Sequence, residues 1–505
     1  MLRDELKNIF GKSSVYMIGQ FLSRIVAFMM IPIYTRFISP TNYGAMELIE
    51  VSTGALGMLA AMGVSEGLTR FYYGEEDESK RGVVVKTALL GIGGLGFIII
   101  AILTLFSPLF TGVLFASGEY AWIFQVALVT VWFGLLVDIC FTYLRMMYMA
   151  RFFVIVTILK LFVALTLNII FVVVLELDIL GIFYSTIITQ SLTGFFLCFY
   201  ILRSVQGRVS FGLLKNMLLF GAPLVPARMG LMLGFLSNRF FLRYLYSGDP
   251  ATALAQVGLL SLGHKFAVII NRFVTVPFNS FWGPRRHEIL LSGEEGASET
   301  VARICTYSTF LTVYVALFIC SGIESIIEIV ATTQYKGAHV VVPFVALSYI
   351  VVGLESHFTS GMLYKKKTNN LTYISLGALA VVLVWNWYFI PAWGLIGAAT
   401  SNLAGFGVRV VAIYIFSQRC YYIPFEVRRL TTLIVAGVAL YGLSQLVKLE
   451  SALATVLIQE SIASTLPLTL LVLGFYTEGE RATFLKFVGE RFGGSRKSSE
   501  WIDGG

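Results

Sequence analysis

The chain has 505 residues, of which 57% are hydrophobic and only 13% are charged. A soluble domain carries about 25% charged residues, so this composition excludes a soluble enzyme and a soluble binding module. The formal net charge is +8. The positions of the cations assign most of this charge to membrane topology, and no nucleic-acid partner is expected.

Apolar segments of about 20 residues or more, the length that crosses a bilayer as a helix, recur along the whole chain. Backbone groups in lipid must be hydrogen-bonded within their own segment, so each segment is predicted to be an α-helix. The expected fold class is an all-α polytopic membrane protein with about fourteen transmembrane helices. These helices are predicted at 13–38, 43–69, 83–110, 119–144, 152–175, 179–202, 216–242, 252–281, 300–323, 338–363, 371–390, 393–417, 429–447 and 452–476.

The lysines and arginines indicate how these helices are oriented. If the N-terminus is cytoplasmic, most of the 37 lysines and arginines fall in cytoplasmic segments. Only four fall in the outside loops, namely Arg36, Arg243, Lys336 and Lys448. Cytoplasmic loops of membrane proteins carry such an excess of positive charge. Both termini are therefore predicted to be cytoplasmic, and the protein is expected in the cytoplasmic (inner) membrane.

The two halves of the chain resemble each other weakly. LKNIFG (6–11) recurs as LKNMLLFG (214–221), and Leu180 with Gly181 has a counterpart in Ile396 with Gly397. Six helices in each half preserve orientation, which predicts two six-helix lobes related by a parallel repeat, with substrate bound between them. The predicted divisions are an N-terminal lobe (1–210), a C-terminal lobe (211–420), two further helices (421–480) and a basic cytoplasmic tail (481–505).

Several basic residues fall inside predicted helices, where a cation costs about 2.5–3.5 kcal/mol on insertion scales and should face a cavity or a partner. In SLGHKFAVIINRF (261–273), Lys265 and Arg272 are seven residues apart and share one helical face. Snorkelling toward a helix end, or an interhelical ion pair such as Lys160 with Asp138, is the alternative role for each cation. The predicted substrate-binding residues are Arg24, Lys160, Arg228, Arg239, Lys265 and Arg272.

Acidic residues inside predicted helices are the candidates for ion coupling. Glu47, Glu50 and Asp138 could each carry a coupling proton, or could play a plain structural role. Glu66 and Arg70, one turn apart near a helix end, are expected to pair structurally. The five cysteines and four histidines lack metal-ligand spacing. No metal and no cofactor are expected, apart from a coupling proton or sodium ion.

Four segments carry a resemblance to a known family. The N-terminal run with Gly19 and Arg24 is similar to Wzx-type polysaccharide flippases, as are SPTNYG with its helix start YGAMEL (39–48), GLTRFYYGEEDESKR (67–81) and VGLLSLGHKFAVIINRFVTVPFNSFWGPRR (257–286). These flippases belong to the multidrug/oligosaccharidyl-lipid/polysaccharide (MOP) exporter superfamily, and the resemblance covers nearly the whole chain. It implies two six-helix lobes around a cationic cavity. It also implies translocation of an isoprenyl-diphosphate-linked oligosaccharide from the cytoplasmic to the outer leaflet.

The expected function is therefore a lipid-linked oligosaccharide flippase that works by alternating access and is not an enzyme. Arg24, Arg228 and Lys265 are the foremost candidates for charge-assisted hydrogen bonds to the anionic head group. By resemblance, proton or sodium antiport would drive transport. The flippase would serve O-antigen (lipopolysaccharide), capsule or exopolysaccharide synthesis, beside a polymerase and a chain-length regulator.

Four other functions compete with this expectation. A flippase for a lipid II-type peptidoglycan precursor would differ only in the head group it carries. A multidrug or cation antiporter of the same superfamily should have an acidic cleft, whereas the predicted interior is basic. A membrane-bound polymerase is disfavoured because all the predicted outside loops are short. A membrane scaffold would give no reason for cations inside both halves.

Overall fold

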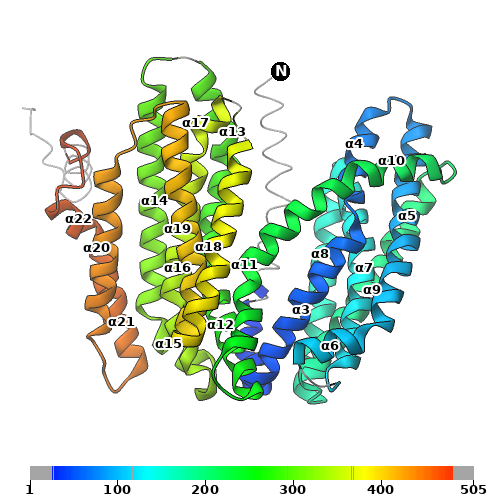
Figure 1. Cartoon of the computed structure of the whole chain (residues 1–505), viewed down its shortest axis with the longest axis horizontal. Helices are drawn as coiled ribbons and strands as arrows, with labels where there is room; N and C mark the ends of the chain where they lie inside the picture. The colour runs from blue at the N-terminus through cyan, green and yellow to red at the C-terminus, as the bar shows by residue number, and fades with distance from the viewer. Residues whose placement is uncertain are drawn as a thin grey trace, which may run out of the picture. The chain divides into compact units, whose positions relative to one another are not determined.

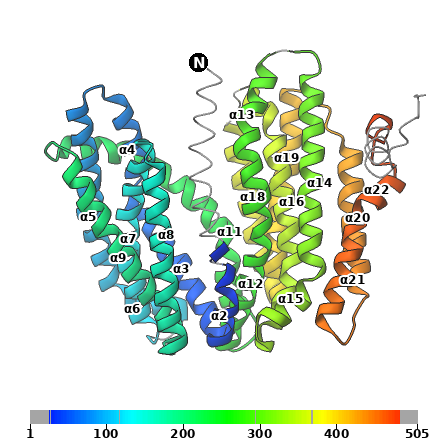
Figure 2. The same cartoon turned by 180° about the vertical axis from the view of Figure 1, so that it is seen from behind.

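The computed structural model describes residues 25–26, 28–115, 118–292, 294–365, 367 and 369–481. All regular elements in these ranges are helices, shown in Figure 1 and from behind in Figure 2. The first part of the chain holds α2 (Ile31–Phe37), α3 (Pro40–Ala61), α4 (Val64–Gly74), α5 (Glu78–Leu105), α6 (Ser107–Phe115), α7 (Ala121–Met146), α8 (Ala150–Asn168), the π-helical segment η1 (Ile169–Val174) and α9 (Asp178–Ser204).

The middle of the chain contains two short segments of different helical pitch. Its elements are α10 (Phe211–Gly221), the 3₁₀ turn η2 (Ala222–Leu224), α11 (Val225–Leu245), α12 (Pro250–Ile270), the π-helical segment η3 (Asn271–Thr275) and α13 (Val276–Ser292). The remaining elements are α14 (Ala297–Ser321), α15 (Ile323–Val330), the 3₁₀ segment η4 (Thr333–Val340), α16 (Val341–Phe358), α17 (Ser360–Tyr364), α18 (Asn369–Trp393), α19 (Leu395–Cys420), α20 (Val427–Gln445), α21 (Ala452–Ser464) and α22 (Leu466–Val472).

Within the described part of the chain, 12 helical runs are long and apolar enough to cross a membrane. The bent pair Phe211–Gly230 and Gly234–Leu245 would raise this number to 13. The first predicted span, 13–38, lies largely outside the described residues. The expectation of an all-helical, multi-pass membrane protein is confirmed, with 12–13 described spans where about fourteen were predicted.

Polar caps at the loops determine where several helices begin. The Ser39 hydroxyl accepts a hydrogen bond from the backbone N of Asn42 at 3.2 Å, just before the proline that starts α3. The Asp249 carboxylate accepts from the backbone N of Ala251 at 3.1 Å and of Thr252 at 3.2 Å, before the proline that starts α12. Hydrogen bonds from the Thr252 side chain and backbone lower the pKa of Asp249. Such caps satisfy amides that the first helical turn leaves free.

The chain divides into two compact units, which are described separately. Among the described residues, unit 1 comprises those within 25–266, 327–348 and 373–409, and unit 2 those within 267–326, 349–372 and 410–481. The two units are defined by how compactly their segments pack. The predicted divisions are defined instead by the internal repeat: two lobes (1–210 and 211–420), two further helices (421–480) and a tail (481–505). The predicted divisions stay a prediction.

In unit 1, α7 is the central helix of a bundle and packs against α3, α5 and α9, while α8 packs on α9 (Figure 2). Buried apolar side chains such as Leu68, Leu89, Ile139 and Leu197 fill the contacts, each at most 2% exposed. Because lipid tails are as apolar as leucine, close packing and interhelical hydrogen bonds hold such a bundle together.

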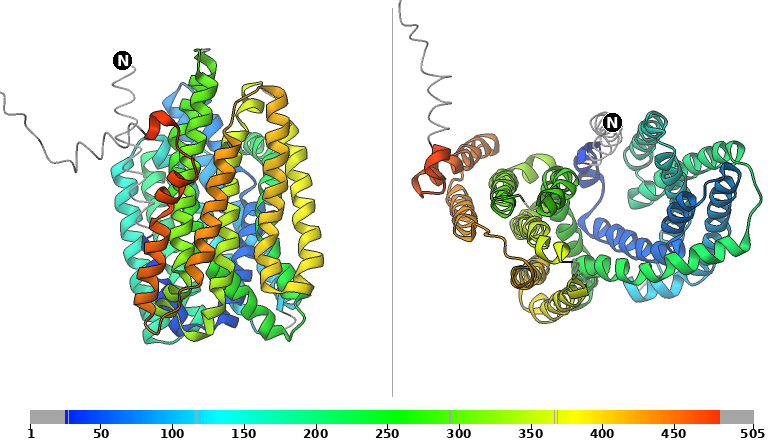
Figure 3. Two further views of the ribbon diagram at one scale, coloured as in Figure 1. Left: turned by 90° about the vertical axis from the view of Figure 1, so that its left-hand side faces the viewer. Right: turned by 90° about the horizontal axis from the view of Figure 1, so that it is seen from above.

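In unit 2, α14 packs against α13, α20 and α21, and the last helices α20–α22 lie together at one edge (Figures 1 and 3). Two glutamine side chains bond across these helices. Gln445 Nε2 donates to the Ser321 carbonyl at 3.1 Å, and Gln459 Nε2 donates to the Ser444 carbonyl at 3.2 Å. The first bond attaches α20 to the end of α14, and the second joins α21 to α20.

Candidate functional site

A charged cluster forms in unit 1 where α3, α11 and α12 meet. Arg239 Nε of α11 lies 3.0 Å from Glu47 Oε1 of α3, and Lys265 Nζ of α12 lies 3.9 Å from Glu47 Oε2. The Arg239 side chain is only 2% exposed, whereas that of Lys265 is 36% exposed. Arg239 and Glu47 therefore form a buried ion pair. Lys265 is a second cation of this cluster and is more accessible than Arg239.

Tyrosines hold the Lys265 ammonium in place. Lys265 Nζ donates to the Tyr43 hydroxyl at 2.8 Å and lies 4.7 Å from the Tyr43 ring centroid. Tyr43 is itself buried and packs edge-on against Tyr335, whose hydroxyl donates to the Ile38 carbonyl at 2.8 Å. Since each ring is positioned by a further contact, the ammonium is oriented as well as charged.

Two glycines bring α3 and α12 close enough for this cluster to form. A Cβ on Gly44 would lie 1.9 Å from the Leu254 carbonyl oxygen, and one on Gly258 would lie 2.2 Å from the Pro40 carbonyl oxygen. Small residues let membrane helices approach closely. Glu47 follows Gly44 by about one turn, and Lys265 follows Gly258 by about two turns.

Buried asparagines, which were not predicted as site residues, attach α11 to α18 and α19. Asn238 Nδ2 donates to the Ala398 carbonyl at 3.0 Å, and Asn402 Nδ2 donates to the Phe235 carbonyl at 3.1 Å. Asn386 Nδ2 bonds a serine hydroxyl of α11 at 3.3 Å. The Oδ1 atoms of Asn386 and Asn402 are buried without a hydrogen-bond partner and could hold a water or a small cation. Within the described ranges, no three His, Cys, Asp or Glu side chains group as metal ligands.

Two expected ion pairs are replaced by other contacts. Glu66 does not pair with Arg70, because its carboxylate contacts Arg228 of α11. The Arg70 guanidinium instead lies over the Phe220 ring, 4.3 Å from its centroid. Helix packing supplies a partner from α11, which spacing within a single helix could not predict.

Lys160 likewise bonds a neutral partner. Its Nζ lies 2.9 Å from the Gln190 Oε1 of α9, and the described residues contain no ion pair between Lys160 and Asp138. Asp138 is exposed on α7, where its backbone carbonyl accepts the Thr142 hydroxyl. Because the Gln190 amide is uncharged, the pairing of opposite charges could not predict it as the partner of Lys160.

The remaining predicted site residues are distributed between the two units. Glu50 is exposed on α3, three residues after Glu47, in unit 1. Arg272 is exposed on η3 in unit 2, while Lys265 belongs to unit 1. Arg24 lies outside the described residues. The structure thus brings together Glu47, Arg239 and Lys265, and pairs Arg228 with Glu66.

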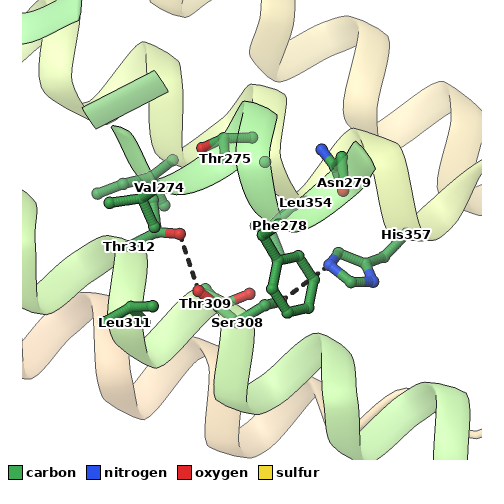
Figure 4. Close-up of a pocket in the computed structure, with 12 residues that line it drawn as sticks. Val274, Thr275, Phe278, Asn279, Ser308, Thr309, Leu311, Thr312, Leu354 and His357 are labelled. Atoms are coloured by element: carbon green, nitrogen blue, oxygen red, sulfur yellow. Dashed lines mark hydrogen bonds between the residues drawn. The ribbon is translucent and has the colours of Figure 1, made fainter. Parts of the chain in front are cut away.

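A second polar site, which was not predicted from the sequence, surrounds His357 in unit 2 (Figure 4). The imidazole is 2% exposed, and its Nε2 lies 2.8 Å from the Ser308 hydroxyl of α14. His357 Nδ1 and the Thr275 hydroxyl are buried without hydrogen-bond partners beside a small cavity. Asn279 and Thr312 also face this cavity. Because these residues come from three separate helices, no local sequence pattern marks the site.

Comparison with known proteins places this arrangement in a family. Residues 9–288, more than half of the chain, match the family described as Polysaccharide biosynthesis protein. No curated protein matches the chain.

Among solved structures, the lipid II flippase MurJ in an inward closed conformation is similar, with a TM-score of 0.68 at 12% identity. The match covers 90% of this chain and 99% of that one. An inward-facing multidrug resistance MATE family transporter of the MOP superfamily gives a TM-score of 0.55 at 16% identity, covering 81% and 95%. A MATE in complex with MaL6 gives 0.53 at 14% identity, covering 84% and 96%.

At these identities, the likeness to solved structures shows the fold alone. The fold is similar to that of MurJ and of the MATE family transporter. The match over more than half of the sequence shows the family as well. The chain belongs to the polysaccharide biosynthesis protein family.

Proposed function

We propose that the protein is a lipid-linked oligosaccharide flippase of the cytoplasmic membrane. It moves an isoprenyl-diphosphate-linked sugar repeat unit from the cytoplasmic to the outer leaflet by alternating access. The product supplies a cell-surface polysaccharide, which a polymerase and a chain-length regulator of the same pathway would extend. Family membership and the MOP-superfamily fold support this proposal.

The position of Lys265 carries the proposal. Glu47 is bonded to buried Arg239 at 3.0 Å and lies farther, at 3.9 Å, from Lys265. Arg239 therefore neutralises most of the Glu47 charge. Lys265 remains a partly exposed cation, and its Nζ is oriented by a 2.8 Å hydrogen bond to the Tyr43 hydroxyl. An oriented ammonium suits a diphosphate, which accepts charge-assisted hydrogen bonds.

The other predicted cations are proposed to bind the same substrate. Arg228 is exposed on α11 and could release Glu66 to bind the substrate diphosphate. Arg239 is buried and could bind substrate only after its ion pair with Glu47 separates. Arg24, Arg272 and Lys160 complete the proposed substrate-binding set.

The proposed transport is coupled to a proton or sodium ion. Glu47, Glu50 and Asp138 are the proposed coupling acids, and the side chains of Glu50 and Asp138 are exposed on their helices. Glu47 would exchange an ion only when its pair with Arg239 separates. A membrane acid whose partner changes between conformations can couple ion binding to transport.

A second candidate is a flippase for a lipid II-type precursor. The observation that favours it is the likeness in fold to the lipid II flippase MurJ over 90% of this chain. Both substrates join an isoprenyl diphosphate to a sugar head group, so the same cations would serve either one. A multidrug or cation antiporter fits less well, since the accessible member of the cluster is Lys265.

The test uses a strain from which the gene has been deleted. Isoprenyl-diphosphate-linked glycans are quantified by mass spectrometry, and a membrane-impermeant glycosidase applied to spheroplasts reports their leaflet. We expect a completed oligosaccharide to accumulate in a protected form, and wild-type protein to restore its accessibility. The mass of the sugar distinguishes a polysaccharide repeat unit from a peptidoglycan precursor.

Variants then connect the phenotype to the site. Lys265→Gln and Arg24→Ala should fail to restore glycan accessibility at wild-type protein levels in the membrane. Lys80→Gln, which removes an exposed lysine outside the cluster, should complement fully. Glycans that remain accessible in the deletion strain would overturn the proposed function.

A further inference from the structure

A cavity of about 930 Å³ lies in unit 2, beside the first turns of α14 and the end of α22. Its lining is mixed in character. Pro467, Leu468 and Leu471 supply apolar side chains, while Arg303, Glu480 and Arg481 supply charged ones. This combination of an apolar wall with a few convergent polar groups is typical of a ligand site.

The segment 476–481, which contributes to the cavity lining, is attached to α14 and α20. The Glu480 carboxylate is 2.9 Å from Arg429 Nη2 and accepts from the Thr477 backbone N at 2.8 Å and from the Tyr307 hydroxyl. Burial raises the pKa of Glu480, but these hydrogen bonds and the Arg429 charge outweigh burial and lower it. The Arg429 guanidinium also lies 4.6 Å from the Phe475 ring centroid. The Glu480 carboxylate is therefore ionised and forms its ion pair with Arg429.

The two arginines of the wall have no such partner. Among the described residues, neither Arg303 nor Arg481 forms an ion pair with a carboxylate. Within residues 25–481, Arg481 Nη2 makes a long 3.5 Å bond to the Leu471 carbonyl, and the buried Arg481 Nε has no hydrogen-bond partner. The Glu480 carboxylate also lines the cavity, but it is engaged by Arg429, which leaves the two guanidinium groups of the lining for an anionic ligand. Phosphate matches their planar donors.

The position in the chain points to the source of that phosphate. The segments 285–303 and 481–497 are both predicted to be cytoplasmic from the distribution of positive charge. Leu468 and Val472 of α22 are 61% and 86% exposed, as expected for side chains that face lipid. Arg303 and Arg481 therefore lie at the predicted head-group level of the cytoplasmic leaflet, which carries anionic lipids.

We propose that this cavity binds an anionic phospholipid, with its phosphate held by Arg303 and Arg481 and an acyl chain lying along Leu468 and Leu471. The bound lipid connects α14 to α22 and stabilises the last helices of unit 2. This site is separate from the Lys265 cluster, and the proposal does not depend on what the protein transports.

Native mass spectrometry of the detergent-solubilised full-length protein provides the first test. Phosphatidylglycerol and phosphatidylcholine with identical acyl chains are added at equal concentrations. The wild type should retain phosphatidylglycerol at least several-fold better and gain thermal stability from it. Inorganic phosphate alone should not stabilise the protein, because it lacks the acyl chain. Stabilisation by inorganic phosphate equal to that by phosphatidylglycerol would mean an anion site without lipid and would overturn the proposal.

Matched arginine variants locate the binding. Arg303→Gln and the double variant Arg303→Gln/Arg481→Gln should lose the preference for phosphatidylglycerol. Arg151→Gln, which removes an exposed arginine in unit 1, should keep it. Arg303 is exposed, so its single variant is expected to fold even if the double variant does not. A wild type without preference, or a preference retained in Arg303→Gln, would count against the site.

Photo-crosslinking in intact membranes identifies the occupant. A benzoylphenylalanine replacing Leu471 should yield a phospholipid adduct, identified by mass spectrometry. An isoprenyl lipid adduct would assign the cavity to the transported substrate, and a peptide adduct would assign it to this chain or another protein. Either result would overturn the proposed phospholipid site.

Discussion

At the residue scale, the buried pair between Arg239 and Glu47 has the largest expected effect on stability. Arg239→Gln would leave the Glu47 carboxylate buried without its 3.0 Å partner, at a cost of about 3–5 kcal/mol. We expect a clearly lower midpoint of thermal unfolding in detergent. The double variant Arg239→Gln/Glu47→Gln should recover much of the loss, since no charge remains buried. Equal midpoints for wild type and Arg239→Gln would contradict this assignment.

Glu50 offers a test of how the Lys265 cation is balanced. Its exposed carboxylate lies one turn beyond Glu47 on α3, and its charge acts on Lys265. Glu50→Gln removes a negative charge, so an isoprenyl diphosphate should bind roughly three- to tenfold tighter, for a Coulomb energy of about 1 kcal/mol. Calorimetric titration of the purified protein measures this change. Weaker binding would show that Glu50 helps to hold the ligand.

At the element scale, the approach of α3 to α12 determines the geometry of the charged cluster. Gly258→Ala would place a Cβ 2.2 Å from the Pro40 carbonyl oxygen, a backbone atom that can yield only if the helices separate. We expect reduced thermal stability and reduced complementation of the deletion strain, because α12 carries Lys265. Gly134→Ala is the control, since its Cβ would meet nothing within 4 Å. That variant should be neutral or stabilised by up to about 1 kcal/mol. Wild-type behaviour of Gly258→Ala would contradict the close contact.

At the scale of the whole molecule, the predicted orientation can be tested on the two sides of one span. Ala452–Val472 is apolar enough to cross the membrane, and Glu450 and Glu478 are exposed on either side of it. In a cysteine-free background, Glu450→Cys should react with an impermeant maleimide added to intact spheroplasts. Glu478→Cys should react only after the membrane is opened. The reverse pattern would refute a cytoplasmic C-terminus.

The sequence predicted the helical membrane fold well, but it predicted the site only in part. Apolar run length and the need to satisfy backbone groups within each segment are local properties. Lys265 and Glu47 were singled out because charges inside apolar runs are costly wherever they point. Asn386 and His357 were missed because neutral polar side chains interrupt an apolar helix only weakly.

The sequence by itself determined a multi-pass helical membrane protein with an excess of cations at its predicted cytoplasmic side. Only the tertiary structure decided which charges meet. Arg239 pairs with Glu47, which lies 192 residues away in the sequence. Arg228, and not Arg70, pairs with Glu66. Lys160 bonds the side-chain amide of Gln190. The physical reason is that helix formation depends on neighbours in sequence. Charge pairing depends on interhelical distance, which small residues such as Gly44 determine across the bundle.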